Sequence, residues 1–372
     1  MSVPLLDLVA QHRTVKDRVM AAALGVIERQ GFIMGPEVGE FECAVAGVCR
    51  TRHAVGCASG TDALLLPLKA LDLKPGDEVI TPAFTFFATA GAVHNAGARP
   101  VFADIDPVTY NISPAAIEAA ITPRTRAIIV VHLFGQMAPV EQILPIARRH
   151  GLALIEDAAQ AIGARRTIDG AWRMAGELGT VGTLSFFPSK NLGGWGDGGM
   201  MVTQDDNLAE RLRRLRLHGG SRQYFHDEVG TNSRLDTLQA AVLLAKLPFL
   251  AGWSEARRRN AARYNESFAP NAAIGVPVTE PLNEHIFNQY TIQVPDRDGL
   301  QAHLRQQGIG SAVYYPLALH LQPCFQYLGY RPGSLPVTEA ATERVVSLPV
   351  FPELSREQQD SVIRAVMSFV HA

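Results

Sequence analysis

One lysine of this 372-residue chain has the surroundings of a reactive amine. Lys190 ends the stretch Ser185-Phe-Phe-Pro-Ser-Lys190, which follows an apolar strand-like segment and precedes a glycine-rich turn at 193–199. Burial in a cleft lowers the pKa of an amine and favours its neutral, nucleophilic form. The other lysines are expected at ordinary surface positions, so Lys190 is the candidate for Schiff-base chemistry; they are Lys16, Lys69, Lys74 and Lys246.

A carboxylate ends another apolar segment. Residues 152–156 read as a buried strand, and Asp157 and Gln160 follow it. Ligands of open α/β sheets bind outside the carboxyl ends of strands, where an ionised carboxylate needs a partner. A pyridinium nitrogen would be such a partner. Asp157 would equally serve as the N-cap of the alanine-rich segment after it, and this motif alone leaves both readings open.

Two further segments could hold parts of a cofactor. At Ser59, Gly60 and Thr61 a strand runs into a helix, whose first N–H groups form an anion site, although a plain helix cap has the same pattern. The segment is neither a P-loop nor a dinucleotide fingerprint. Pro82–Phe87 offers an aromatic face for a planar ring, but core packing is the expected role of at least two of its three phenylalanines.

The elements that must position these residues alternate between short strands and helices from Thr51 to about Lys246. This alternation is typical of an α/β domain with a mostly parallel sheet. Two more strands surround the glycine-rich loop. The expected strands are 54–57, 78–81, 99–104, 127–132, 152–156, 179–188 and 198–203, and the expected helices are 62–70, 115–120 and 140–150.

A domain boundary is expected near residue 250. A long apolar helix at 235–250 is followed by a charged, arginine-rich helix at 253–268. A strand at 290–294, a helix at 297–307 and a final helix from Ser355 complete an α+β pattern. We therefore predict a large domain with an N-terminal arm at 1–250 and a small C-terminal domain at 251–372.

Composition excludes several classes of protein. Hydrophobic residues make up 47% and charged residues 19%, which is normal for a globular protein, and the net charge of −2 lacks the footprint of a nucleic-acid or polybasic membrane binder. The four cysteines have no zinc-site spacing, so no metal is expected. Without a secretory signal pattern or an apolar run of ~20 residues, a cytoplasmic location is expected.

Together these motifs resemble the DegT/StrS-type nucleotide-sugar aminotransferases, which have the aspartate-aminotransferase fold (fold type I). The motifs follow the order and spacing of that family, and the resemblance extends from Leu6 to the C-terminus. They are 58–64, 75–82, Glu156–Gln160, Ser185–Lys190, Gly196–Gly199 and Asn232–Asp236.

The resemblance implies pyridoxal 5'-phosphate as cofactor. Lys190 would form the Schiff base and then move the proton, Asp157 would pair with the ring nitrogen, and Gln160 would contact the region of the ring hydroxyl. Phe86 would stack on the ring. Gly60, Thr61 and Ser185 would hold the phosphate. Asn232 would reach the phosphate in the neighbouring subunit, which implies a homodimer with shared sites. The residues facing the substrate would be Arg234, Tyr315 and, as a weaker candidate, His320.

The implied reaction moves an amino group from L-glutamate to a keto group of a nucleotide-linked sugar. The stretches 218–226 and 229–241 look most like the subgroup acting on 3-keto sugars, closest to enzymes that make a UDP-linked 2-acetamido-3-amino uronic acid for surface polysaccharide such as O-antigen. Arg234 would pair with the sugar carboxylate. Tyr314 departs from that subgroup, which tends to carry His there. A dTDP- or GDP-linked 3-keto or 4-keto deoxysugar is the alternative.

Three rival functions remain. Dehydratases of the same family replace the reactive lysine with histidine, which Lys190 argues against. A regulatory protein on the same scaffold would bind the cofactor without turnover. A nicotinamide-dependent dehydrogenase lacks support, because the glycine fingerprint is absent from the first strand-to-helix turn.

Overall fold

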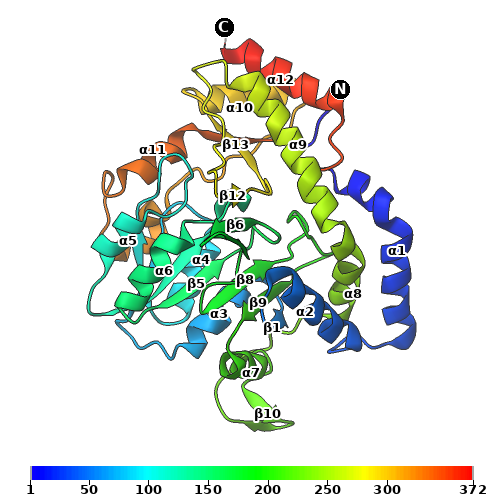
Figure 1. The fold of residues 1–372 in the computed structure, drawn as a ribbon, viewed down its shortest axis with the longest axis vertical. Coiled ribbons are helices and arrows are strands. Elements are labelled where there is room, and N and C mark those ends of the chain that lie inside the picture. Colours follow the sequence, from blue (N-terminus) through cyan, green and yellow to red (C-terminus); the bar gives the residue numbers. More distant parts are fainter. Residues whose placement is uncertain (1, 371–372) are drawn as a thin grey trace.

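A seven-stranded sheet forms the centre of the computed structural model, which describes residues 2–370. Its strand order is β1-β9-β8-β5-β4-β2-β3, and β9 alone runs against the other strands. Figure 1 labels β1, β9, β8 and β5 in the middle of the molecule. The predicted α/β fold with a mixed, mostly parallel sheet is confirmed. The strands are β1 (His53–Cys57), β2 (Glu78–Pro82), β3 (Arg99–Ala103), β4 (Thr125–Val131), β5 (Ala153–Asp157), β8 (Val181–Ser185) and β9 (Gly199–Thr203).

Helices cover both faces of this sheet. Apolar side chains of one face pack with α1 (Leu8–Arg29), α2 (Pro36–Cys49), α5 (Pro114–Ala120), α6 (Val140–Arg149) and α8 (Thr237–Lys246). The other face packs with α3 (Gly60–Ala70), α4 (Ala88–Asn95) and α7 (Asp206–Leu215). A strand covered on both faces has buried apolar residues in succession, as in β4, where Ala127–Val131 is buried without alternation.

The long helix expected at 235–250 is interrupted. Helix α8 ends at Lys246, the 3-10 turn η2 (Leu247–Phe249) follows, and α9 (Leu250–Phe268) continues the chain. Pro248 lies in the turn, where its missing N–H cannot support an α-helical hydrogen bond.

The C-terminal residues form their own apolar cluster, which also includes Val3. The antiparallel strands β13 (Tyr290–Gln293) and β14 (Val345–Leu348) pack there with α9, α10 (Arg297–Gln306) and α12 (Arg356–Val370). The division into domains at residue 250 stays a prediction. The remaining elements are η1 (Leu133–Gly135), β6 (Arg165–Ile168), β7 (Ala171–Met174), β12 (Asn283–Glu284), η3 (Leu319–Leu321), η4 (Pro323–Leu328) and α11 (Pro336–Arg344).

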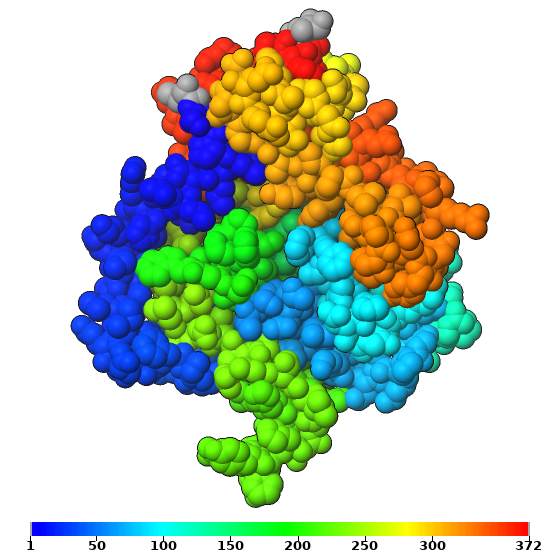
Figure 2. Space-filling model, turned by 180° about the vertical axis from the view of Figure 1, so that it is seen from behind, coloured from blue at the N-terminus to red at the C-terminus, as the bar shows by residue number. Residues whose placement is uncertain are grey.

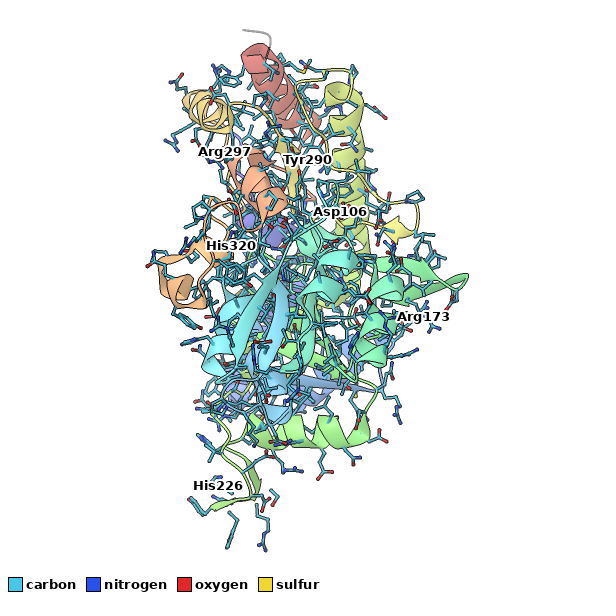
Figure 3. All side chains as sticks on the ribbon, turned by 90° about the vertical axis from the view of Figure 1, so that its left-hand side faces the viewer. Asp106, Arg173, His226, Tyr290, Arg297 and His320 are labelled. Carbon is cyan, nitrogen blue, oxygen red and sulfur yellow. The ribbon has the colours of Figure 1, made fainter. Side chains whose placement is uncertain are left out.

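A short hairpin projects from the body of the molecule. Strands β10 (Gly220–Arg222) and β11 (Phe225–His226) form it (Figure 2), and Figure 3 labels His226, which pairs with Gly220. Tyr224 is 85% exposed at the turn, so an aromatic ring lies in water with little protein around it. Across residues 2–370, no helix combines the length and the apolar character needed to cross a membrane.

Candidate active site

A cavity of about 460 Å³ lies where several parallel strands end. Its walls come from segments directly after β1, β2, β5 and β8, which all run in one direction, so their carboxyl ends meet at one edge of the sheet. Seven predicted cofactor residues and one predicted substrate residue line it: Gly60, Thr61, Phe86, Asp157, Gln160, Ser185, Lys190 and Tyr315.

The start of α3 approaches Ser185 closely. Ser59 caps the helix by accepting a hydrogen bond from the Asp62 N–H at 3.1 Å. A Cβ added to Gly60 would lie 2.7 Å from the Ser185 Cβ, and one added to Gly199 would overlap the Ser59 carbonyl oxygen. Both glycines therefore allow Ser185 and β9 to pack closely against the start of α3, where Gly60 and Thr61 line the cavity. The first N–H groups of a helix favour an anion.

The Asp157 carboxyl and the Lys190 amine both face this cavity. Burial raises the pKa of the Asp157 carboxyl above its ordinary value, against the hydrogen bonds from Ala159 and Thr89 and the charge of Lys190. Burial lowers the pKa of the Lys190 amine, against the charge of Asp157. The amine is thus brought toward the neutral form that a nucleophile needs.

Gln160 has a fixed orientation at the cavity wall. Its Oε1 accepts a hydrogen bond from the Phe134 N–H at 2.7 Å, so its Nε2 is the atom that donates to the Tyr315 hydroxyl at 3.2 Å. Tyr315 packs between Phe84 and Phe86, with ring centroids 5.9 and 6.4 Å away. Of the three phenylalanines in Pro82–Phe87, only Phe84 is buried, whereas Phe86 and Phe87 are 59% and 46% exposed. The expectation that at least two of them pack in the core was therefore wrong.

The loop that carries Lys190 is held from α8. The Gln239 side chain accepts from the Trp195 N–H at 2.8 Å, and the Lys246 Nζ donates to the Gly193 carbonyl oxygen at 2.5 Å. Lys246 is 5% exposed, so the expectation of a surface position was wrong. It lies on the side of α8 that faces this loop, which a uniformly apolar helix pattern does not reveal.

Three predicted site residues lie outside this cavity. Asn232 is exposed and pairs with Leu217 through a β-bridge, and Arg234 lines a separate, open hollow of about 940 Å³ beside the projecting hairpin. His320, labelled in Figure 3, is 1% exposed. Its Nε2 lies 3.0 Å from Glu339 Oε1. The single chain therefore does not bring His320 to the cavity, because η3 buries it beside Phe102.

The sequence interpretation missed two threonines that line the cavity. Thr89 lies in α4 and donates to the Asp157 carboxylate at 2.9 Å, and Thr85 lies 3.2 Å from Thr89. Their spacing of four residues after the carboxyl end of β2 was the available signal. A Thr pair inside an apolar segment, however, is also typical of ordinary packing.

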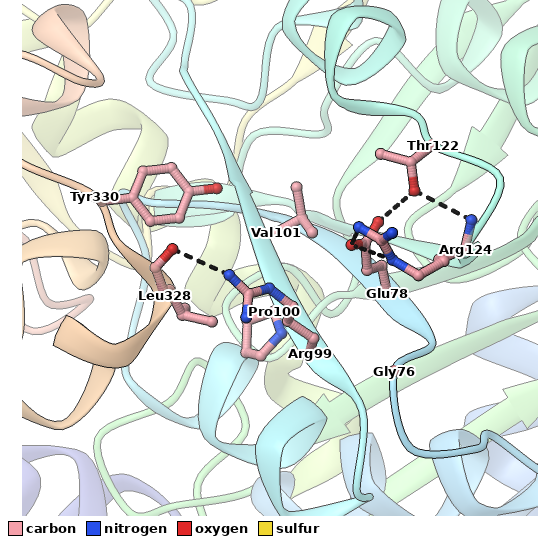
Figure 4. A pocket seen from close by; sticks show the side chains of 9 residues that line it. All are labelled: Gly76, Glu78, Arg99, Pro100, Val101, Thr122, Arg124, Leu328 and Tyr330. Atoms are coloured by element: carbon pink, nitrogen blue, oxygen red, sulfur yellow. Dashed lines mark hydrogen bonds and ion pairs between the residues drawn. The ribbon is translucent and has the colours of Figure 1, made fainter.

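A second hollow, of about 400 Å³, opens at the opposite edge of the sheet, where β2 and β3 begin (Figure 4). Its polar groups contact one another: Arg124 forms an ion pair with Glu78 at 2.6 Å, and Arg99 donates a hydrogen bond to the Leu328 carbonyl oxygen at 3.0 Å. It offers no group for the chemistry described above. Within residues 2–370, no cluster of three or more His, Cys, Asp or Glu side chains is placed to hold a metal ion.

The fold and this cavity define an aminotransferase of fold type I. The DesV enzyme of Streptomyces venezuelae, solved with a ketimine intermediate, superimposes with a TM-score of 0.96 over 100% of this chain and 99% of that one, at 42% identity. The NtdA protein of Bacillus subtilis, solved with bound pyridoxamine phosphate, gives 0.89 over 99% and 83%, at 33% identity. The chain belongs to the DegT/DnrJ/EryC1/StrS aminotransferase family, whose model matches residues 13–367. The predicted family and enzyme class are confirmed.

Three relatives carry different names. A pleiotropic regulatory protein of Geobacillus stearothermophilus is 52% identical over 99% of both chains. A UDP-N-acetyl-3-dehydro-alpha-D-glucosamine 3-aminotransferase of Acidithiobacillus ferrooxidans is 45% identical over 100% of this chain and 98% of its own. A UDP-2-acetamido-2-deoxy-3-oxo-D-glucuronate aminotransferase of Pseudomonas aeruginosa is 44% identical over 95% and 96%.

Proposed function

We propose that this chain transfers an amino group from L-glutamate, through pyridoxal phosphate, to a keto group of a nucleotide-linked sugar. One observation carries the proposal: the Lys190 amine and the Asp157 carboxylate face a single cavity beside the open N-terminus of α3. The donor set fits the cofactor, since helix N–H groups suit a phosphate, a carboxylate suits a pyridinium nitrogen and an amine suits an aldehyde. Once bound, the cofactor would supply an electron sink for the proton shift.

Each protein group has a distinct part. Lys190 would hold and return the proton at the reacting carbon, because burial lowers the pKa of its amine and makes the proton easier to release. Gly60, Thr61 and Ser185 would bind the phosphate, Phe86 would cover the ring, and Asp157 would keep the ring nitrogen protonated. The Gln160 amide, held by Phe134, would donate to the ring hydroxyl.

The substrate we favour is a UDP-linked 2-acetamido-3-keto uronic acid. Two relatives are named for UDP-linked 3-keto sugars, and one of these sugars is a uronate. Arg234 and Tyr315 are the residues proposed to meet the sugar. His320 is left out of this proposal, because it is buried beside Phe102 and Glu339. Arg234 would need to come from a second chain, because it lies outside the cavity of its own chain. We therefore infer a homodimer in which Asn232 and Arg234 complete the partner's site, and a cytoplasmic location where the nucleotide sugar and glutamate are available.

The test separates catalysis from regulation, a question raised by the name of the Geobacillus relative. Addition of L-glutamate to the purified holoenzyme is expected to convert the cofactor absorbance to that of pyridoxamine phosphate. Lys190→Ala is expected to abolish this change, and Lys16→Ala, at an exposed lysine of α1, is the control that retains it. A cofactor spectrum that glutamate leaves unchanged would assign the chain to a regulatory role.

A substrate panel then tests the sugar. UDP-, dTDP- and GDP-linked 3-keto and 4-keto sugars are each added to the aminated enzyme, with the UDP-linked 3-keto glucosamine and uronate compared directly. The uronate is expected to react fastest. Arg234→Gln should lower kcat/KM for the uronate much more than for the glucosamine, because only the uronate has a carboxylate to pair with the guanidinium. Turnover of a 4-keto deoxysugar alone would overturn the assignment.

A further inference from the structure

The Asp157 carboxylate is held by a hydroxyl that has no assigned role. Thr89 Oγ1 donates to Asp157 Oδ2 at 2.9 Å, and the Ala159 N–H donates to Oδ1 at 3.2 Å. Thr89 is 1% exposed and Asp157 5% exposed, so bulk water does not compete for these bonds. A hydrogen bond to a buried ionised group is stronger than one between neutral groups.

The direction of this small network follows from the chemistry of its members. An ionised carboxylate only accepts hydrogen bonds, so the single hydroxyl proton of Thr89 points to Asp157. Thr85 Oγ1 lies 3.2 Å from Thr89 Oγ1 and must therefore donate to it. Thr85 is 3% exposed. The chain of donors runs from Thr85 through Thr89 to Asp157, and each hydroxyl fixes the rotamer of the next group.

The two threonines approach Asp157 from a different segment of the fold. Both line the cavity. Thr89 lies in α4, which packs against the sheet, whereas Asp157 ends the strand β5. The bond from Thr89 thus fixes the position of the carboxylate relative to a second element. Lys190 and His132 are the charged or titratable groups that act electrostatically on Asp157 from other segments.

We propose that Thr89, oriented by Thr85, is a positioning residue that fixes the Asp157 carboxylate toward the ring nitrogen of the cofactor. The inference rests on the proposed function, in which Asp157 pairs with that nitrogen. It predicts that the benefit of Thr89 depends on the ring nitrogen, whereas a purely structural hydroxyl would support every ligand of the cavity equally.

The test compares two cofactors. Dissociation constants are measured by absorbance titration of apoprotein with pyridoxal phosphate and with the analogue in which carbon replaces the ring nitrogen. Thr89→Val, which keeps size and branching, is expected to weaken pyridoxal phosphate about tenfold, the range of a hydrogen bond to a charged group. It should change binding of the analogue less than about twofold. Thr89→Ser should restore wild-type affinity, and Thr85→Val should cause a smaller loss.

Unfolding temperatures of the apoproteins verify that each variant folds, and Thr89→Ala replaces Thr89→Val if the valine variant does not. Equal losses for both cofactors, or no loss for pyridoxal phosphate, would overturn the role of Thr89. Asp157→Asn separates the two proposals. If it weakens pyridoxal phosphate selectively but Thr89→Val does not, only the present inference fails. If Asp157→Asn has no selective effect, the assigned role of Asp157 fails and the inference falls with it.

Discussion

At the scale of single residues, the side-chain amines of two lysines are buried in different environments. Lys190 faces the cavity, whereas Lys246 binds the Gly193 carbonyl oxygen and lies 5.8 Å from the ring centre of Trp253. Burial lowers the pKa of Lys246 to about 8, partly offset by the charge of Glu353. The native protein therefore releases the Lys246 proton at lower pH than the unfolded chain, whose lysines titrate near ~10.4.

The lower pKa of Lys246 in the native protein makes stability depend on pH in a defined direction. Between about pH 8 and pH 10 the unfolded chain binds more protons at Lys246, so stability rises with pH through this window. Lys246→Met removes the effect, and its stability relative to wild type should be highest near pH 7 and fall by up to about 3 kcal/mol toward pH 10. Urea unfolding at several pH values measures this, with exposed Lys16→Met as control. A difference that does not vary with pH would contradict the assignment.

At the scale of elements, the end of β5 presents two carboxylates to opposite sides. Asp157 faces the cavity, and Glu156 is fully buried on the other side, against the loop between β7 and β8. Glu156 Oε2 accepts from Gly176 at 3.1 Å and from His132 Nε2 at 2.8 Å; Oε1 accepts from Leu178 and Gly179. Despite burial, these donors hold the pKa of Glu156 below its ordinary value.

The tautomer of His132 makes the hydrogen bonds around Glu156 incompatible with a glutamine side chain. His132 Nδ1 accepts from the Ala138 N–H at 3.1 Å, so its Nε2 carries the proton donated to Glu156. Either orientation of Glu156→Gln places an NH2 group against two donors, which should lower the free energy of unfolding by roughly 3 kcal/mol. Urea unfolding measures the loss. Glu210→Gln, at a 70% exposed side chain, should change stability little. A stability loss equal to that of Glu210→Gln would contradict the network.

At the scale of the whole molecule, the cavity of one chain has few positive charges. Among the described residues that line it, Lys190 is the only Lys or Arg, whereas a nucleotide diphosphate and a carboxylate favour several cations. Arg234 lies on the separate surface beside the projecting hairpin. A second copy that brought this surface to the cavity would supply the missing charge.

Mixed dimers test this arrangement. Lys190→Ala and Arg234→Ala are each expected to be inactive with the uronate substrate. If sites are shared, a mixed dimer holds one intact site, and random mixing should restore about a quarter of wild-type activity. Separately tagged chains refolded together provide the measurement, and two Lys190→Ala preparations mixed in the same way are the control. No recovery would place Lys190 and Arg234 in the same chain's site.

Sequence patterns were sufficient to predict the alternating strands and helices around the central sheet and the candidates Lys190 and Asp157. Both follow from local patterns, since a strand end, a glycine-rich turn and an apolar run are formed by neighbouring residues. The prediction that Gly60, Gln160 and Ser185 approach the same cavity depends on parallel strands ending at one edge, and the structure places all three there.

Which distant side chains meet depends on the tertiary structure. Tyr315 reaches Gln160 across 155 residues, Thr89 reaches Asp157 across 68, and Lys246 turns toward Gly193 instead of solvent. His320 is buried against Glu339 for the same kind of reason. Local periodicity specifies which face of a helix or strand is apolar, but the partner of a polar side chain depends on how separate elements pack. Those partners set the charge and orientation of the groups at the site.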